Sequence, residues 1–330
     1  MAPGAIYDDP VQHDGAVLES ISDAIDTVNL LKAQAAEKKK ALLAAEPSPE
    51  DSVALAAFDA PSEFNSAKDK SSFRQYEAAC DRVKGFYAEQ HAKQTVAYNL
   101  AARQRFHSSA RKRPDMTVWE AMEKLDTLVD ESDPDTQLSQ IQHLLQSAEA
   151  IRRDGKPRWM QLVGLIHDLG KLMLFFDGAQ GQWDVVGDTF PIGCKFDERC
   201  IYPETFCANP DSKHEIYGSK NGIYEAGCGM DNLIMSWGHD EYLYLVVKDQ
   251  CCLPREALAM IRYHSFYPWH QEGAYREFMA EGDEELLRAV KAFNPYDLYS
   301  KSDGVPSVEK LKPYYLELID EFFPRKKIKW

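Results

Sequence analysis

The most informative part of the chain is Trp159-Met-Gln-Leu-Val-Gly-Leu-Ile-His-Asp-Leu-Gly-Lys171, because it combines a continuous apolar helical pattern with charged residues at its end. On a helix that turns 100° per residue, His167 shares one face with Gly164, Gly170 and Lys171. A glycine inside a helix costs about 1 kcal/mol relative to alanine. Two glycines in an apolar helix indicate that another part of the molecule approaches its backbone closely.

The pair His167-Asp168 offers an imidazole nitrogen and a carboxylate that can bridge two metal ions. A lone His-Asp dipeptide is more often a buried histidine beside a hydrogen-bonded aspartate. Other predicted helices add candidate ligands, namely His143, His239 (which begins a second His-Asp pair), His264 and Asp297. His143 lies opposite the apolar stripe of its helix, on a face that either meets solvent or lines a polar cavity, and taken alone this position favours solvent. Four imidazoles and two carboxylates are too many for one open catalytic metal, so the set favours two ions of iron, manganese or zinc.

The remainder of the chain predicts an all-α fold, because alternating period-two runs are nearly absent. Only Gln182–Val186 suggests a short strand. A long irregular region rich in Gly, Cys and Asp is expected over residues 177–232. Apolar residues at helical spacing predict helices over residues 73–105, 118–128, 138–151, 158–176, 240–248, 254–264, 284–291 and 308–323.

Residues 1–70 are expected to form an N-terminal extension ahead of one catalytic unit over residues 71–330. They contain 13 acidic and 6 basic residues and no Trp. Apolar residues at helical spacing from Leu18 to Leu31 predict one amphipathic helix over about residues 16–45. The Pro-bearing stretch from Pro47 to Glu63 is interpreted as a linker. Whether the helix docks on the body or stays mobile is left open.

The charge balance excludes several classes of partner. The 330 residues include 38 basic and 53 acidic side chains, a net charge of −15, which would repel nucleic acid and anionic membranes. No apolar run is long enough to span a membrane, and the N-terminus lacks the pattern of a signal peptide. The seven cysteines show no CxxC pair, so neither structural zinc nor a disulfide framework is expected. These features favour a reduced, cytoplasmic protein.

Longer strings around the candidate ligands carry a specific resemblance. His143, His167-Asp168 and Asp297 follow the metal pattern of the HD-domain superfamily, and the fuller strings resemble the myo-inositol oxygenase family from about Arg74 to Trp330. The strings are Leu128-Val-Asp-Glu-Ser-Asp-Pro-Asp135, Leu165-Ile-His-Asp-Leu-Gly-Lys171, Val185-Val-Gly-Asp-Thr-Phe-Pro191, Met235-Ser-Trp-Gly-His-Asp-Glu-Tyr242 and His264-Ser-Phe-Tyr-Pro-Trp-His270. The resemblance implies an HD-domain-like helical bundle.

The resemblance also implies a ligand set and a chemistry. It assigns one iron to His143, His167, Asp168 and Asp297, and a second iron to Asp168, His239 and His264. Asp168 would bridge a mixed-valent Fe(II)/Fe(III) pair. The partners implied are myo-inositol and dioxygen, and the products are D-glucuronate and water. A monomer is expected.

The substrate site follows from the same matching strings. Asp168 and Lys171 are the implied catalytic residues, and Lys171 would contact an inositol oxygen bound to metal. The other residues implied to contact the substrate are Arg74, Asp130, Glu131, Ser132, Gly187, Asp188, His264, Ser265 and Lys301. A polar rim suits a ligand with several hydroxyl groups, because a buried hydroxyl without a partner is costly.

Two other functions remain open at this stage. An HD-type phosphohydrolase would use the metals to activate water, although no Arg/Lys cluster for a phosphate accompanies Lys171. A metal-stabilised helical binding protein without catalysis is the third hypothesis. Among the remaining histidines, His13, His91, His107 and His214 are expected at the surface, and His270 is expected to be structural.

Overall fold

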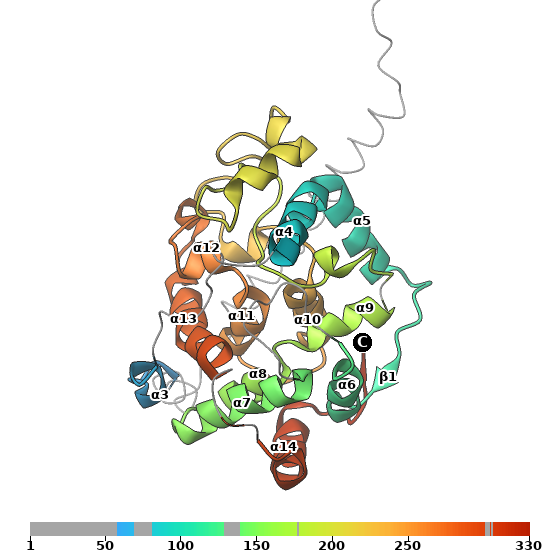
Figure 1. Cartoon of the computed structure of the whole chain (residues 1–330), viewed down its shortest axis with the longest axis vertical. Coiled ribbons are helices and arrows are strands. Elements are labelled where there is room, and N and C mark those ends of the chain that lie inside the picture. The colour runs from blue at the N-terminus through green and yellow to red at the C-terminus, as the bar shows by residue number, and fades with distance from the viewer. Residues whose placement is uncertain (1–57, 69–80, 129–138, 177, 301–303, 305) are drawn as a thin grey trace, which may run out of the picture. The chain divides into compact units, whose positions relative to one another are not determined.

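The structure is a computed structural model that describes residues 58–68, 81–128, 139–176, 178–300, 304 and 306–330. It is mainly helical, as predicted. Five helices pack against one another at its centre (Figure 1). They are α7 (Gln140–Arg153), α8 (Arg158–Ile166), α10 (His239–Val247), α11 (Arg255–Tyr263) and α13 (Asp283–Tyr299).

Other elements surround this bundle. The longer helices are α4 (Asp81–Lys93), α5 (Val96–His107), α6 (Val118–Leu125) and α14 (Val308–Phe322), and the short ones are α3 (Glu63–Ser66), α9 (Met173–Phe176) and α12 (Tyr267–His270). The 3₁₀ turns are η3 (Leu169–Leu172), η4 (Gln182–Asp184), η5 (Pro203–Ala208), η6 (Pro210–Lys213), η7 (Met230–Asn232) and η8 (Arg276–Phe278). Strands β1 (Asp115–Met116) and β2 (Ile328–Lys329) form a small antiparallel ladder.

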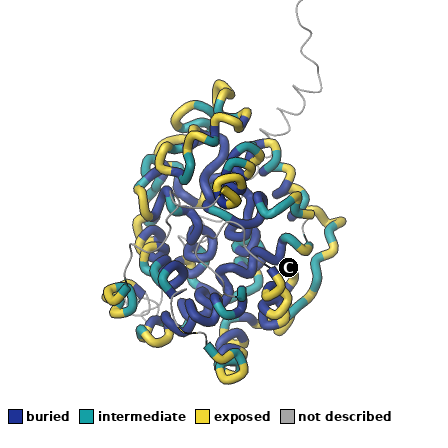
Figure 2. Tube along the Cα trace, viewed as in Figure 1, coloured by how far each residue is buried: buried dark blue, intermediate teal, exposed yellow. Residues whose placement is uncertain are grey.

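Helix α8 is buried on every side, which explains the uninterrupted apolar stretch that encodes it. All of its residues from Trp159 to Ile166 are buried, and Figure 2 shows the central helices in the buried colour. The two glycines allow the close approaches that the sequence predicts. A Cβ on Gly164 would lie 2.7 Å from Ile151 Cδ1, and a Cβ on Gly170 would lie 1.9 Å from the His239 carbonyl oxygen. Helix α7 can therefore pack directly on the backbone of α8, and α10 on the backbone of η3.

The helix predicted over residues 158–176 is wrong in its continuity. Helix α8 ends at Ile166, and the chain tightens into η3 and then α9. The backbone of Asp168 has φ −92° and ψ −2°, which departs from ideal α-helical values but stays in the right-handed helical region. Lys171 now lies three residues after Asp168 along a tighter turn, so its side chain returns toward that carboxylate. The break occurs at the proposed metal ligands.

The helix predicted over residues 73–105 is also interrupted, within its described part, between α4 and α5. Thr95 caps α5, because its side chain accepts a hydrogen bond from the Tyr98 N–H. The Gln94 side chain donates to the Trp237 carbonyl at 2.7 Å. Because the helix is interrupted at Gln94, this side chain can bind the backbone of Trp237, in the segment just before α10.

Two further predictions are corrected. The strand expected at Gln182–Val186 is the 3₁₀ turn η4. The helix expected over residues 284–291 continues to Tyr299 and contains Pro295. Pro295 removes one backbone donor, but Phe293 and Tyr296 on either side of it are fully buried, so packing holds the helix together. This extension places Asp297 on a helix.

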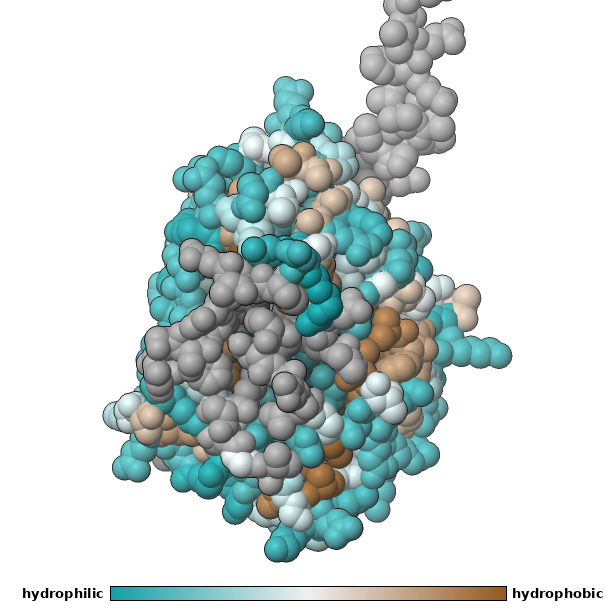
Figure 3. Space-filling model, viewed as in Figure 1, coloured by the Kyte–Doolittle hydropathy of each residue, from teal (hydrophilic) through white to brown (hydrophobic). Residues whose placement is uncertain are grey.

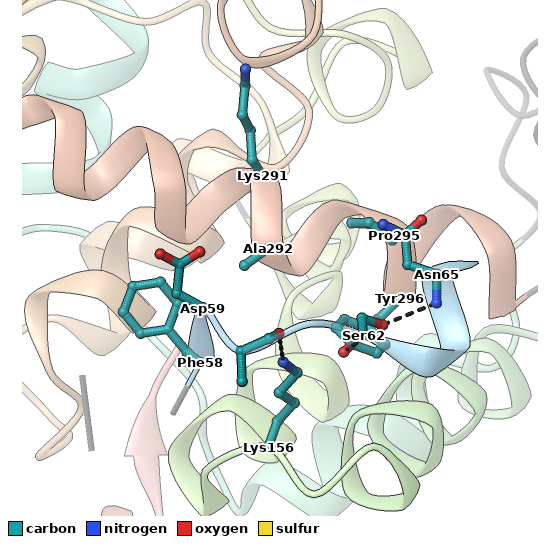
Figure 4. A pocket seen from close by; sticks show the side chains of 10 residues that line it. Phe58, Asp59, Ser62, Asn65, Lys156, Lys291, Ala292, Pro295 and Tyr296 are labelled. Atoms are coloured by element: carbon teal, nitrogen blue, oxygen red, sulfur yellow. Dashed lines mark hydrogen bonds between the residues drawn. The ribbon is translucent and has the colours of Figure 1, made fainter. Parts of the chain in front are cut away.

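Residues 58–63 were assigned to a linker, and that prediction is wrong. Residues 58–68, here called the clasp, pack on α13 and the end of α7 (Figure 4). The Phe58 ring meets Trp159 edge-on, and Phe64 stacks on Tyr296. The Lys156 ammonium donates to the Ala60 carbonyl at 2.5 Å. Between the clasp and α13 lies a cavity of about 130 Å³.

The amphipathic helix predicted over residues 16–45 lies outside the described residues. Among the described helices, none is both long and apolar enough to cross a membrane. On the face shown in Figure 3 the described surface is mostly hydrophilic, with apolar residues in limited patches.

Candidate metal centre

Six of the predicted site residues meet in the middle of the five-helix bundle. His143 comes from α7 and Asp297 from α13, while His167 and Asp168 follow α8 directly. His239 begins α10, and His264 follows α11. All six are buried, with exposed fractions from 0% to 8%. His143 therefore does not face solvent, because α8 and α13 both pack against α7.

The first group of ligand atoms consists of His143, His167 and Asp297. Asp297 Oδ1 lies 3.1 Å from His143 Nε2 and 3.3 Å from His167 Nε2. Asp168 Oδ2 lies 3.8 and 3.7 Å from the same two nitrogens. Two ligands that meet at a right angle, each about 2.1 Å from a metal, are about 3.0 Å apart. The group therefore has the dimensions of a metal site.

The second group contains His239 and His264, whose Nε2 atoms lie 3.2 Å apart. Asp168 Oδ1 lies 3.4 Å from His239 Nε2 and 3.7 Å from His264 Nε2. The two oxygens of Asp168 thus face different histidine groups. This is the arrangement required of a carboxylate that bridges two metal ions.

Backbone hydrogen bonds determine which nitrogen of each histidine faces the centre. The Nδ1 atoms of His167, His239 and His264 donate to the carbonyls of Gly164, Val185 and Ile261 at 2.8 to 3.0 Å. A carbonyl can only accept, so each Nδ1 carries the proton and each Nε2 presents a lone pair. His167 Nε2 is buried without a hydrogen-bond partner among the described residues. These lone pairs fit a cation at the centre.

The charges of the centre lead to the same conclusion. Although burial would raise it, the Lys171 ammonium and the neighbouring histidines hold the pKa of Asp168 well below its ordinary value. Burial would lower the pKa of His264, but the carboxylates of Asp240, Asp297 and Asp168 raise it to about 9. The group thus attracts positive charge strongly, and metal ions would replace the protons that otherwise neutralise it.

Lys171 lies beside the bridging carboxylate. Its ammonium donates to Asp168 Oδ2 at 2.8 Å, and the residue is only 7% exposed. An ammonium is a hydrogen-bond donor only, so it cannot ligate a metal while protonated. The structure therefore places a fixed positive charge next to the two ligand groups.

Part of the predicted substrate site adjoins the second group. The Val185 carbonyl binds both the N–H and the Nδ1 of His239, and the Thr189 N–H donates to the Ser265 carbonyl. Ser265 Oγ lies 3.4 Å from His239 Nε2. Gly187 and Asp188 lie in the loop between these two contacts, so they are brought to the same side of the centre.

Gly187 and Asp188 are positioned by α4. Gly187 has φ +95°, a value that favours glycine, and a Cβ there would lie 2.8 Å from both Gln90 Nε2 and Phe86 Cε1. The Tyr87 hydroxyl donates to Asp188 Oδ1 at 3.3 Å. The other predicted substrate residues, Arg74, Asp130, Glu131, Ser132 and Lys301, lie outside the described residues.

A buried ion pair joins the two helices that carry the second group. Glu241, in the first turn of α10, accepts from Arg262 Nε of α11 at 2.6 Å. Arg103 of α5 adds a second guanidinium at 3.4 Å from Glu241. Removing one partner from such a pair would leave an uncompensated buried charge. The sequence analysis missed these residues, although Glu241 and Arg262 lie only two positions from His239 and His264.

The remaining histidines divide between surface and core. His107 and His214 are exposed as predicted, and His13 lies outside the described residues. His91 was expected at the surface but is fully buried, where it stacks on Phe206. Burial lowers the pKa of His91 to about 3, so it is neutral and structural. His270 is buried and donates to the His264 carbonyl, which confirms a structural role.

Comparisons with known proteins agree with this geometry. A family model described as myo-inositol oxygenase matches residues 80–330. The chain is 49% identical over 266 residues to inositol oxygenase of Dictyostelium discoideum, covering 79% of this chain and 91% of that protein. Inositol oxygenase 1 of Arabidopsis thaliana is 49% identical over 264 residues, covering 78% and 84% respectively. Inositol oxygenase of Rattus norvegicus is 45% identical over 263 residues, covering 78% and 91%. The chain therefore belongs to the myo-inositol oxygenase family.

Proposed function

We propose that this protein uses dioxygen to cleave the ring of myo-inositol, giving D-glucuronate and water. Family membership supports this reaction. The structural observation that supports this reaction most directly is the position of Asp168, whose two oxygens face two different histidine groups. A site with two metal ions suits an oxidation that a pair of acid and base residues could not perform on a neutral polyol.

The proposed cofactor is a pair of iron ions, mixed-valent Fe(II)/Fe(III) in the active form. One ion would be held by His143, His167, Asp168 and Asp297, and the other by Asp168, His239 and His264. Imidazole and carboxylate ligands suit iron. When bound, the irons would supply the activation of dioxygen that cleavage of a carbon–carbon bond requires.

The protein's own residues would bind and orient the substrate. We assign to Lys171 the role of donating to an inositol oxygen and favouring its deprotonated form, because its ammonium is buried beside Asp168. Ser265, Gly187 and Asp188 border the second histidine group and would hydrogen-bond further hydroxyls, with His264 contacting the substrate at that edge. Arg74, Asp130, Glu131, Ser132 and Lys301 are proposed from the family resemblance.

The phosphohydrolase alternative has weaker support. A phosphate ester would require several cationic side chains at the metals. Within the described part of the chain, Lys171 is the one Lys or Arg that pairs with a carboxylate of the two ligand groups, whereas Arg103 and Arg262 are engaged by Glu241. We also propose that the protein is cytoplasmic, because the described cysteines are free thiols. We further propose that it is a monomer.

The test is to measure dioxygen consumption and D-glucuronate formation by the iron-loaded protein with myo-inositol. We expect one dioxygen consumed for each glucuronate formed. Release of phosphate from phosphate esters without consumption of dioxygen would instead support the phosphohydrolase. Light scattering after size exclusion would test the monomer.

A further inference from the structure

Asp240 is a buried carboxylate next to the second histidine group. It follows His239 in the first turn of α10 and is only 1% exposed. Its Oδ1 lies 2.8 Å from His239 Nε2 and 3.4 Å from His264 Nε2. These two nitrogens and this oxygen form a further group with the spacing of metal ligands.

The contact between Asp240 and His239 requires positive charge, supplied either by a proton on His239 Nε2 or by a metal ion. His239 Nδ1 donates to the Val185 carbonyl, so a metal-bound or neutral His239 presents only a lone pair at Nε2. A carboxylate oxygen 2.8 Å from that lone pair is repelled unless a positive charge lies between them. A metal held by His239 and His264 would satisfy all three atoms at once.

The two hydrogen bonds that Ser265 donates to Asp240 do not neutralise its charge. The Ser265 N–H donates to Oδ2, and the Ser265 hydroxyl donates to Oδ1, each at 3.0 Å. Both donors are uncharged. Among the described residues, the centre brings together the buried carboxylates of Asp168, Asp297 and Asp240, and Lys171 is the Lys or Arg that pairs with one of them, Asp168. Buried charges without such compensation are costly.

We propose that Asp240 Oδ1 is a ligand of the second metal in the substrate-free protein and yields its position when the hydroxyls of the substrate bind. This inference rests on the proposed function, because the displacing ligand is inositol. On displacement the carboxylate keeps its hydrogen bonds from Ser265. Asp240 thus helps to retain the second metal between turnovers, and the substrate takes its coordination position by ligand exchange.

The experiment compares iron binding by wild type and Asp240→Asn, loaded anaerobically with Fe(II) after chelation and then desalted with and without inositol. Wild type should retain two irons. Without inositol, Asp240→Asn should retain one, with affinity for the second lowered about tenfold or more, or about 1.4 kcal/mol. Adding inositol should raise the iron content of Asp240→Asn most of the way back to two per chain. The affinity of the variant for inositol should not be lower than that of wild type. Two irons retained without inositol, or weaker inositol binding, would overturn the proposal.

Asp283→Asn is the matched control. Asp283 is 2% exposed, begins α13, and accepts from two backbone N–H groups, those of Met230 and Ala280. It resembles Asp240 in burial and in its place at a helix start but belongs to neither ligand group. Its variant should retain both irons whatever it does to the melting temperature.

Ser265→Ala supplies a second test that does not depend on the folding of Asp240→Asn. This substitution removes the Ser265 hydroxyl that donates to Asp240 Oδ1, the proposed metal ligand, but leaves the Asp240 carboxylate in place. We expect both irons to remain. Loss of the second iron would show that Asp240 acts through Ser265 rather than on the metal. If wild type itself neither binds two irons nor consumes dioxygen with inositol, the proposed function fails instead.

Discussion

At Asp168, each carboxylate oxygen has a different neighbourhood. Oδ2 accepts from Lys171 and lies nearest His143 and His167, while Oδ1 lies nearest His239 and His264. One side chain thus joins two ligand groups that come from different helices. Its carboxylate has to be ionised for this role, and the lowered pKa of Asp168 is consistent with that.

Lys171→Ala tests the substrate role of the ammonium. The variant should retain both irons, because Lys171 is not a ligand, but should lower kcat/KM for inositol by about tens- to a hundredfold. That loss corresponds to about 2–3 kcal/mol for a charge-assisted hydrogen bond in a buried site. Steady-state kinetics with iron quantitation in the same preparation measures both. Lys171→Arg keeps the charge and should recover part of the activity. Wild-type kinetics in the alanine variant would contradict the assignment.

The six candidate ligands that meet at the centre could be identified from the sequence, because they lie in long motifs with a specific resemblance. The position of Asp240 could not, because a second His-Asp pair at a helix start does not reveal where its carboxylate points. The solvent exposure expected for His143 was wrong for a related reason. The helical pattern identifies an apolar face, but it does not show that other helices also cover the polar face.

At the scale of elements, the break after α8 is the feature that shapes the centre. Sequence periodicity continues through residues 158–176, so the interruption at His167 and Asp168 could not be predicted from the pattern. It arises from tertiary packing, since the Gly170 backbone meets the His239 carbonyl at the start of α10. The same contact brings His239 toward Asp168.

Gly170→Ala should disrupt this contact. A Cβ would lie 1.9 Å from the His239 carbonyl oxygen, so the start of α10 must move. We expect a loss of about 3 kcal/mol or more in the free energy of unfolding, together with loss of iron from the second group. Gly85→Ala in α4 is the control, because nothing lies within 4 Å of its Cβ position. It should stabilise the helix by about 0.5–1 kcal/mol. Equal melting temperatures for the two variants would refute the packing argument.

The contact between the clasp and α7 predicts a pH-dependent stability. Asp154 accepts from the Tyr296 hydroxyl and from the Glu63 N–H. Although burial would raise it, hydrogen bonds from Ser62, Tyr296 and the Phe64 N–H lower the pKa of Asp154. Its folded pKa lies below the unfolded value of about 3.9. The stabilisation is therefore present at neutral pH and is lost as the pH falls below about 4 through the folded pKa.

Asp154→Asn should consequently lower the free energy of unfolding at neutral pH, by about 1–2 kcal/mol for the weakened hydrogen bonds. The difference from wild type should shrink in strong acid. Urea unfolding at several pH values measures it. Asp59→Asn, which removes only an exposed ion pair with Arg288, should change stability by less than about 0.5 kcal/mol. A difference for Asp154→Asn that persists unchanged at low pH would contradict the pKa argument.

At the scale of the whole molecule, some residues ahead of the expected boundary at residue 70 pack on the helical body. The composition changes near residue 70 in charge and aromatic content, but the packing of the clasp depends on two single aromatic residues. Phe58 and Phe64 pack on Trp159 and Tyr296, and Tyr296 directly precedes Asp297. The clasp therefore supports the helix that carries a metal ligand.

Two truncations separate the clasp from the residues before it. Deletion of residues 1–57 should leave the melting temperature and turnover close to those of the full chain. Deletion of residues 1–68 should lower the melting temperature by several degrees, since about 1 kcal/mol corresponds to roughly 2–4 °C in a domain of this size. Thermal unfolding of both proteins tests this. The clasp would have no structural role if the two truncations melted together.

The most direct test of the bridged pair is the iron content and electron paramagnetic resonance spectrum of Asp168→Asn beside wild type. Wild type, partly reduced and supplied with inositol, should contain two irons per chain and show the signal of a magnetically coupled mixed-valent pair. Asp168→Asn should bind less iron, lack the coupled signal and form no D-glucuronate. An Asp168→Asn protein with two coupled irons and normal turnover would contradict the account.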